Sequence, residues 1–212
     1  MSRKSSASQD QLGFEGFLTQ AEADNRNYKL ERETAHLPGA MDDALPFFRA
    51  LLDRHHAAML TDDEEQVMRL RDEADMLALK LNGFDSGILA GPKASGCKLE
   101  RETTAVPGTV PIWGQAGEFT IALDGMRVRI ELDGVFSIGC GFSYWPGFSA
   151  HAVDWDKPFL SETGYRSFLG IHWPVEKGLK PDSFARKVLA HYIAHDLKGK
   201  PVMPRPLSAR RS

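Results

Sequence analysis

The chain has 212 residues, of which 42% are hydrophobic and 26% are charged, and its formal net charge is −3 at pH 7. These values are typical of a soluble globular protein with one large domain or two small ones. Every apolar run is far shorter than the roughly 20 residues of a membrane-spanning helix, so we expect no membrane partner. The mild negative charge gives no overall attraction to nucleic acid.

The cysteines and the start of the chain indicate a cytoplasmic protein. Cys97 and Cys140 are the two cysteines, and they lack the Cys-x-x-Cys spacing of a metal site. We therefore expect free thiols rather than a disulfide framework. The first residues are polar and basic, without the apolar core of a secretory signal.

The first part of the chain predicts helices. Residues 1–38 are polar and mixed in charge, so we expect a mobile arm with one short helix. Residues 39–83 predict a helical hairpin, because their apolar residues recur at steps of three and four in two runs, 41–59 and 67–81. Between the runs, Thr61-Asp62-Asp63-Glu64 matches a capping box, which predicts that the second helix begins at its threonine.

Residues 84–199 predict an α+β domain with an antiparallel sheet. The many glycines and prolines between 83 and 117 indicate a surface connector. Alternating apolar residues on both sides of Asp124-Gly125 predict a β-hairpin with one apolar face. A second turn signal, Asp133-Gly134, predicts a third strand over Val135–Cys140.

The chain then predicts a helix and a basic tail. Apolar residues from Pro181 to about Leu197 form a broad helical stripe that can cover the sheet. Residues 200–212 form a basic, proline-rich tail, whose cations offer at most weak, non-specific contact with nucleic acid. The predicted fold class is therefore α+β, with an N-terminal helical hairpin, an antiparallel β-meander and a C-terminal helix packed on the sheet.

The candidate ligand-binding region lies after a run of aromatic residues on glycine-rich loops between Gly139 and Trp173. Such rings either close the core of an open sheet or line a recess. The candidate ligand-binding residues are Trp155, Ser161, Glu162, Thr163, Tyr165 and Arg166. Their hydroxyl, carboxylate and guanidinium groups stand beside Gly164 and suit a small polar or anionic ligand. In the alternative interpretation, Ser161 or Thr163 caps a short helix and Arg166 pairs with Glu162.

The stretch Trp-Pro-Gly-Phe-Ser-Ala-His-Ala-Val-Asp-Trp-Asp-Lys-Pro-Phe-Leu-Ser-Glu-Thr-Gly-Tyr-Arg-Ser-Phe-Leu-Gly, which begins at Trp145, resembles a segment of an uncharacterised family of bacterial proteins associated with mobile elements. The likeness extends from about Leu37 to Leu197. The resemblance implies a bacterial, cytoplasmic setting. It names no activity, and no catalytic residue is carried over from it.

Motifs for catalysis are incomplete. His191 and His195 are four residues apart on the predicted last helix, but two ligands do not make a metal site, and the glutamate of the zinc-protease helix is missing. We therefore expect no metal and no cofactor. Cys140 lies between two glycines and is a candidate nucleophile with His151 or His172, although an inert core thiol explains it as well.

Two functions follow. We expect a non-catalytic binding or regulatory protein that uses the aromatic, glycine-rich loops to hold a protein partner or a small polar ligand. The alternative is a small hydrolase-like or metal-dependent enzyme with a site in residues 140–195. Its candidate residues are Cys140, His151, Asp154, Asp156, Glu162, Arg166, His172, His191 and His195. Convergence of three such side chains on one recess would favour the enzyme. The sequence carries no signal for an oligomeric state.

Overall fold

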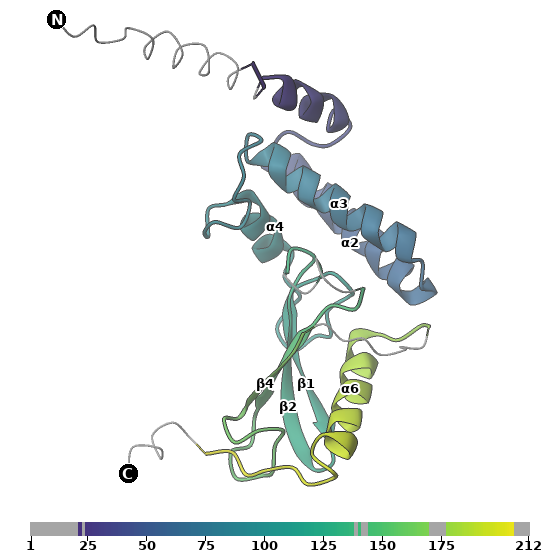
Figure 1. The fold of residues 1–212 in the computed structure, drawn as a ribbon, viewed down its shortest axis with the longest axis vertical. Coiled ribbons are helices and arrows are strands. Elements are labelled where there is room, and N and C mark those ends of the chain that lie inside the picture. Colours follow the sequence, from purple (N-terminus) through teal and green to yellow (C-terminus); the bar gives the residue numbers. More distant parts are fainter. Residues whose placement is uncertain (1–20, 23, 138–139, 141–143, 170–176, 206–212) are drawn as a thin grey trace, which may run out of the picture.

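The fold is α+β, as predicted (Figure 1). A computed structural model describes residues 21–22, 24–137, 140, 144–169 and 177–205. In chain order its elements are α2 (Met41–Thr61), α3 (Glu64–Leu81), α4 (Ser95–Thr103), β1 (Gly117–Leu123), β2 (Met126–Leu132), β3 (Phe148–Ala152), β4 (Tyr165–Phe168) and α6 (Pro181–His195). Among the described residues, every helix is too short or too polar to cross a bilayer.

The helices α2 and α3 lie side by side at one end of the molecule (Figure 1). The predicted capping box is wrong, because Thr61 ends α2 and its hydroxyl donates to carbonyls of the preceding turn. Asp62 adopts the left-handed conformation that closes α2, with φ of 60°. Asp63 is left to cap α3, and its carboxylate accepts the amide N–H of Gln66 at 3.0 Å.

The end of the N-terminal arm is fastened to α3. Residues 24–33 are helical, and the chain then buries Thr34 and Leu37. The Lys80 ammonium donates to the carbonyl oxygens of both residues, at 2.8 and 2.5 Å. Much of the predicted mobile arm, residues 1–20, lies outside the described residues.

The connector between α3 and the sheet is more ordered than predicted. It contains the helix α4, whose Leu99 is fully buried. The hydroxyl of Ser95 at the start of α4 donates to the carbonyl of Ala78 in α3, which joins the two helices. Glycine and proline density alone therefore gave the wrong expectation, because the nine residues of α4 contain no proline and one glycine.

The sheet has four antiparallel strands in the order β1-β2-β3-β4. The predicted hairpin of β1 and β2 is confirmed. The predicted third strand over Val135–Cys140 is wrong for its described residues, 135–137 and 140, which lie outside the sheet. There the chain leaves the sheet, because the Val135 amide bonds to the Gly114 carbonyl and the Phe136 ring stacks on Phe48 of α2, 5.5 Å between centroids. The strand that pairs with β2 is β3.

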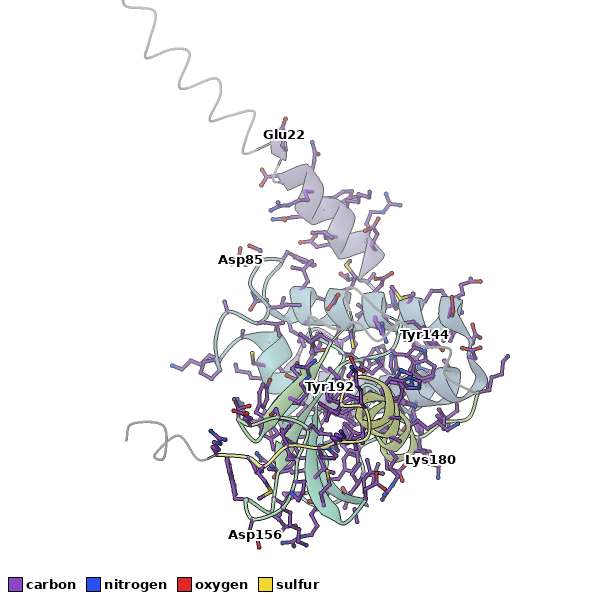
Figure 2. All side chains as sticks on the ribbon, turned by 60° about the horizontal axis from the view of Figure 1, so that its bottom comes forward. Glu22, Asp85, Tyr144, Asp156, Lys180 and Tyr192 are labelled. Atoms are coloured by element: carbon purple, nitrogen blue, oxygen red, sulfur yellow. The ribbon has the colours of Figure 1, made fainter. Side chains whose placement is uncertain are left out.

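One face of the sheet is covered and the other faces solvent. The helix α6 covers the first face, where Phe184 is fully buried among aromatic rings (Figure 2 shows the crowding of side chains between α6 and the sheet). The rings packed around it are Trp113, Trp145 and Phe148, at centroid distances of 5.3, 5.3 and 6.0 Å. Trp145 and Phe148 belong to the predicted aromatic region, and these two rings therefore help to close the core. We call the solvent-facing side the open face.

Candidate binding surface

Tyr165 and Arg166 lie on opposite faces of the sheet, because they are neighbours in the strand β4. The Tyr165 side chain is on the open face, where its hydroxyl lies 3.2 Å from Oγ of Ser149 and its ring meets His151 edge-on. The Arg166 guanidinium is on the other side, 4.8 Å from the centroid of the Tyr192 ring of α6. The structure therefore does not bring these two predicted site residues to a common ligand.

Ser161 and Thr163 shape the turn that leads into β4. Their hydroxyls lie 3.1 Å apart and both bond to the carbonyl of Tyr165, at 2.7 and 3.0 Å. The alternative of a capped short helix is wrong, because residues 161–164 form a turn and Arg166 belongs to a strand. The two hydroxyls hold the backbone at the start of β4.

Trp155 and Glu162 flank that turn. The Trp155 ring covers Gly164, whose φ is +69°, and a Cβ atom there would lie 2.7 Å from the ring. Trp155 remains 44% exposed. The Glu162 side chain is exposed, and its carbonyl accepts the amide N–H of Arg205 at 2.7 Å.

The C-terminal segment passes beside this turn. Phe159 and Val202 exchange two backbone hydrogen bonds, of 2.7 and 2.8 Å. The beginning of the predicted basic tail, residues 200–205, is therefore part of the fold. Residues 206–212 lie outside the described residues.

Three charge pairs lie on or beside the open face. Arg129 pairs with Glu118 at 2.6 Å, and His151 lies 3.1 Å from Glu131. Near the start of β2, the Arg127 guanidinium bonds to both carboxylate oxygens of Asp154. These hydrogen bonds hold the pKa of Asp154 below its usual range. The open face therefore offers no strongly basic surface to a phosphate backbone.

A recess of about 390 Å³ opens where the open face meets α4. It is lined by Glu100, Asp133, Phe136, Ser137, Ser149, Tyr165, Ser167 and Leu169. A neighbouring recess of about 530 Å³ shares the walls formed by Glu100 and Asp133. We call the smaller cavity the acidic recess.

Glu100 is placed in the acidic recess by a backbone contact. One carboxylate oxygen accepts the Gly134 amide N–H at 3.0 Å, and a Cβ atom at that glycine would lie 2.2 Å from the same oxygen. Burial, together with the nearby charge of Asp133, raises the pKa of Glu100. Burial and the charge of Glu131 likewise raise the pKa of Asp133. Both shifts favour the protonated form of the carboxyl group.

Sequence reasoning did not single out the acidic recess. Glu100 and Asp133 are far apart in the chain and belong to no motif, and the fold alone brings them together. Asp133-Gly134 was interpreted as a hairpin turn, although its glycine admits the Glu100 carboxylate. No local signal for this role exists in the sequence.

A buried arginine, Arg71, holds the aromatic, glycine-rich loop. Sequence analysis did not single it out. Arg71 of α3 donates to the carbonyls of Cys140 and Tyr144 at 2.9 and 2.8 Å. Its Nε lies 3.3 Å from Nε2 of His55, and His55 Nδ1 donates to the Trp113 carbonyl at 3.0 Å. Burial lowers the pKa of His55 to about 4, so this imidazole is neutral.

The candidate catalytic groups are spread over several elements. The Cys140 thiol is buried, which raises its pKa and disfavours the thiolate nucleophile. The rings of His191 and His195 lie 4.0 Å apart on α6. Within the described residues, no three His, Cys, Asp or Glu side chains are grouped so that they could hold a metal ion. His172 lies outside the described residues.

The comparisons with known proteins relate this chain to KlcB. Residues 116–201 match the KlcB third domain family, so the match includes the whole sheet, the turn before β4 and α6. The chain is 34% identical over 171 residues to a Protein KlcB of Escherichia coli, covering 80% of this chain and 40% of that protein. A second Protein KlcB of Escherichia coli is 47% identical over 89 residues, covering 42% of this chain and 18% of that protein.

The chain thus spans less than half the length of these curated relatives. No solved structure matches it. The similarity to KlcB confirms the expected resemblance to a bacterial family to which no activity is attached.

Proposed function

Because the similarity to KlcB covers the sheet and its open face, we propose that this chain is a non-catalytic binding protein whose open face holds a protein partner. The observation that carries the proposal is the exposure of large apolar side chains at the β4 end. Tyr165 and Leu169, which line the same recess, are 47% and 64% exposed. Exposed aromatic and aliphatic groups beside polar ones are typical of protein interfaces.

The predicted site residues divide into contact and supporting groups under this proposal. Tyr165 contacts the partner from the open face, and the exposed side chains of Trp155 and Glu162 contact it from the turn before β4. Ser161 and Thr163 support the contact by holding the turn. Arg166 packs on Tyr192 and stabilises the edge of the sheet instead of binding an anion. The compensated charges of the open face favour a protein over a nucleic acid or a small anion.

The proposed setting is the bacterial cytoplasm. Both cysteines are free, which fits a reducing compartment. The association with mobile elements remains part of this proposal.

The test compares surface variants of the folded chain. Tyr165→Ser and Trp155→Ser are used beside the control Tyr28→Ser, whose side chain is 63% exposed on the helix of residues 24–33. Proteins cross-linked to the wild-type chain in its host are identified, purified and titrated against each variant. We expect Tyr165→Ser to weaken binding at least tenfold and Tyr28→Ser to leave it unchanged. Equal binding by all variants would refute the proposal.

A further inference from the structure

The acidic recess contains two carboxylates that no cation of the described residues pairs with. No Lys, Arg or His side chain of the described residues forms an ion pair with Glu100 or Asp133. Elsewhere on the open face the carboxylates of Glu118 and Glu131 do have such partners. Glu100 is partly buried and Asp133 is exposed, so a cation from outside can reach both carboxylates.

The remaining walls of the recess fit the stem of a long basic side chain. Tyr165, Leu169 and Phe136 supply apolar surface at its mouth and side, and Ser149 and Ser167 supply hydroxyl groups. Lysine and arginine side chains commonly lay their methylene groups along apolar surface and extend the charged end to an acceptor. The Tyr165 ring adds a π face for the cation.

We propose that the acidic recess receives a lysine or arginine side chain of the protein partner, with its stem along Tyr165 and Leu169 and its charged end between Glu100 and Asp133. This inference rests on the proposed function and specifies its partner. The volume of about 390 Å³ accommodates one such side chain. Charge complementarity therefore selects a partner segment that is basic at the point of contact.

The backbone of the recess positions the Glu100 carboxylate to accept this cation. The Gly134 amide holds Glu100 by one oxygen, which leaves the second oxygen for the incoming donor. Glu100→Gln keeps an oxygen for the Gly134 amide and removes only the charge. Glu102 stands on the same helix, is exposed, and pairs with Arg101, so Glu102→Gln is a matched control.

The experiment titrates the full chain with blocked amino acids and follows backbone amides by NMR. The probes are Nα-acetyl-lysine amide and Nα-acetyl-arginine amide, with Nα-acetyl-norleucine amide as a probe that has the apolar stem without the charge. We expect a basic probe to give saturable shifts at Gly134 and Ser167. Norleucine should bind at least tenfold more weakly.

The variants decide whether the carboxylates bind the probe. Glu100→Gln and Asp133→Asn should each weaken the basic probe at least fivefold, and Glu102→Gln should not change it. Unfolding midpoints of all variants are measured to confirm that each is folded. Equal shifts with norleucine, wild-type affinity in Glu100→Gln, or no saturable shift with either basic probe would overturn the inference. The proposed function would still stand if Tyr165→Ser nevertheless abolished binding of the purified partner.

Discussion

The two faces of the sheet are built from alternate residues of the same strands, yet they differ in what fixes them. On the covered face, Val128 and Ile130 of β2 are fully buried under α6 and its aromatic neighbours. On the open face, Arg129 between them forms an ion pair at the surface. Packing therefore restricts which side chains the covered face accepts. Side chains of the open face contact solvent, so replacing them should change the free energy of unfolding little. Stability and binding are thus separable properties of one sheet, and substitutions can test that separation.

The largest effect is expected on the covered face. Phe184→Ala should lower the free energy of unfolding by about 3 to 5 kcal/mol, because it leaves a cavity among fully buried rings. Denaturant unfolding of the variant measures the loss. A midpoint equal to that of the wild type would show that α6 does not hold the sheet.

A pH titration tests the buried His55, which lies next to Arg71 beneath the aromatic, glycine-rich loop. His55 has its pKa lowered from 6.5 to about 4, so the folded chain resists the proton that the unfolded chain accepts. Its contribution to stability is complete above pH 6.5 and is lost as the pH falls toward 4. The loss is about 3 kcal/mol. Unfolding measured across this window should therefore show a steeper decline for the wild type than for His55→Gln, and parallel curves would contradict it.

A substitution in the turn before β4 should have an intermediate effect on the free energy of unfolding. Gly164→Ala places a side chain at positive φ and against the Trp155 ring, so we expect a loss of about 1 to 2 kcal/mol. Trp155 fluorescence should shift in the same variant. Gly125→Ala, also at positive φ but with no neighbour within 4 Å, separates backbone strain from the ring contact. Equal losses in both variants would assign the whole cost to the backbone.

The smallest effect is expected on the open face. Arg129→Gln breaks an exposed ion pair with Glu118 and should change the free energy of unfolding by less than about 0.5 kcal/mol. Thermal unfolding at low and high salt measures it. A loss above 1 kcal/mol would mean that the open face is part of the stabilising structure.

The sequence was informative where the structure is local. The hairpin of β1 and β2 follows from an alternating pattern and the turn signal Asp124-Gly125, which lie within a few residues of each other. The third strand was misplaced because the partner of β2 is chosen by packing across the fold. Phe136, with the apolar character of a strand residue, is instead taken up by α2.

Around the candidate site, too, the sequence was informative only about local contacts. The hydroxyls of Ser161 and Thr163 do bond to backbone groups, as their residue type suggests, but they do so in a turn and not at the start of a helix. The strand β4 was not predicted, so its alternation, which separates Tyr165 from Arg166, was missed. Glu100 and Asp133 meet only through tertiary structure.

The pairing of Phe159 with Val202 determines where a probe can be attached near the proposed contact residues. The Arg205 amide is bonded to the Glu162 carbonyl, so the last described residues lie against the turn before β4. A fluorophore or photo-cross-linker attached at position 205 would sit next to the proposed contact residues without replacing any of them. Position 205 is therefore a suitable labelling site. A probe there can detect a bound partner before the partner is identified.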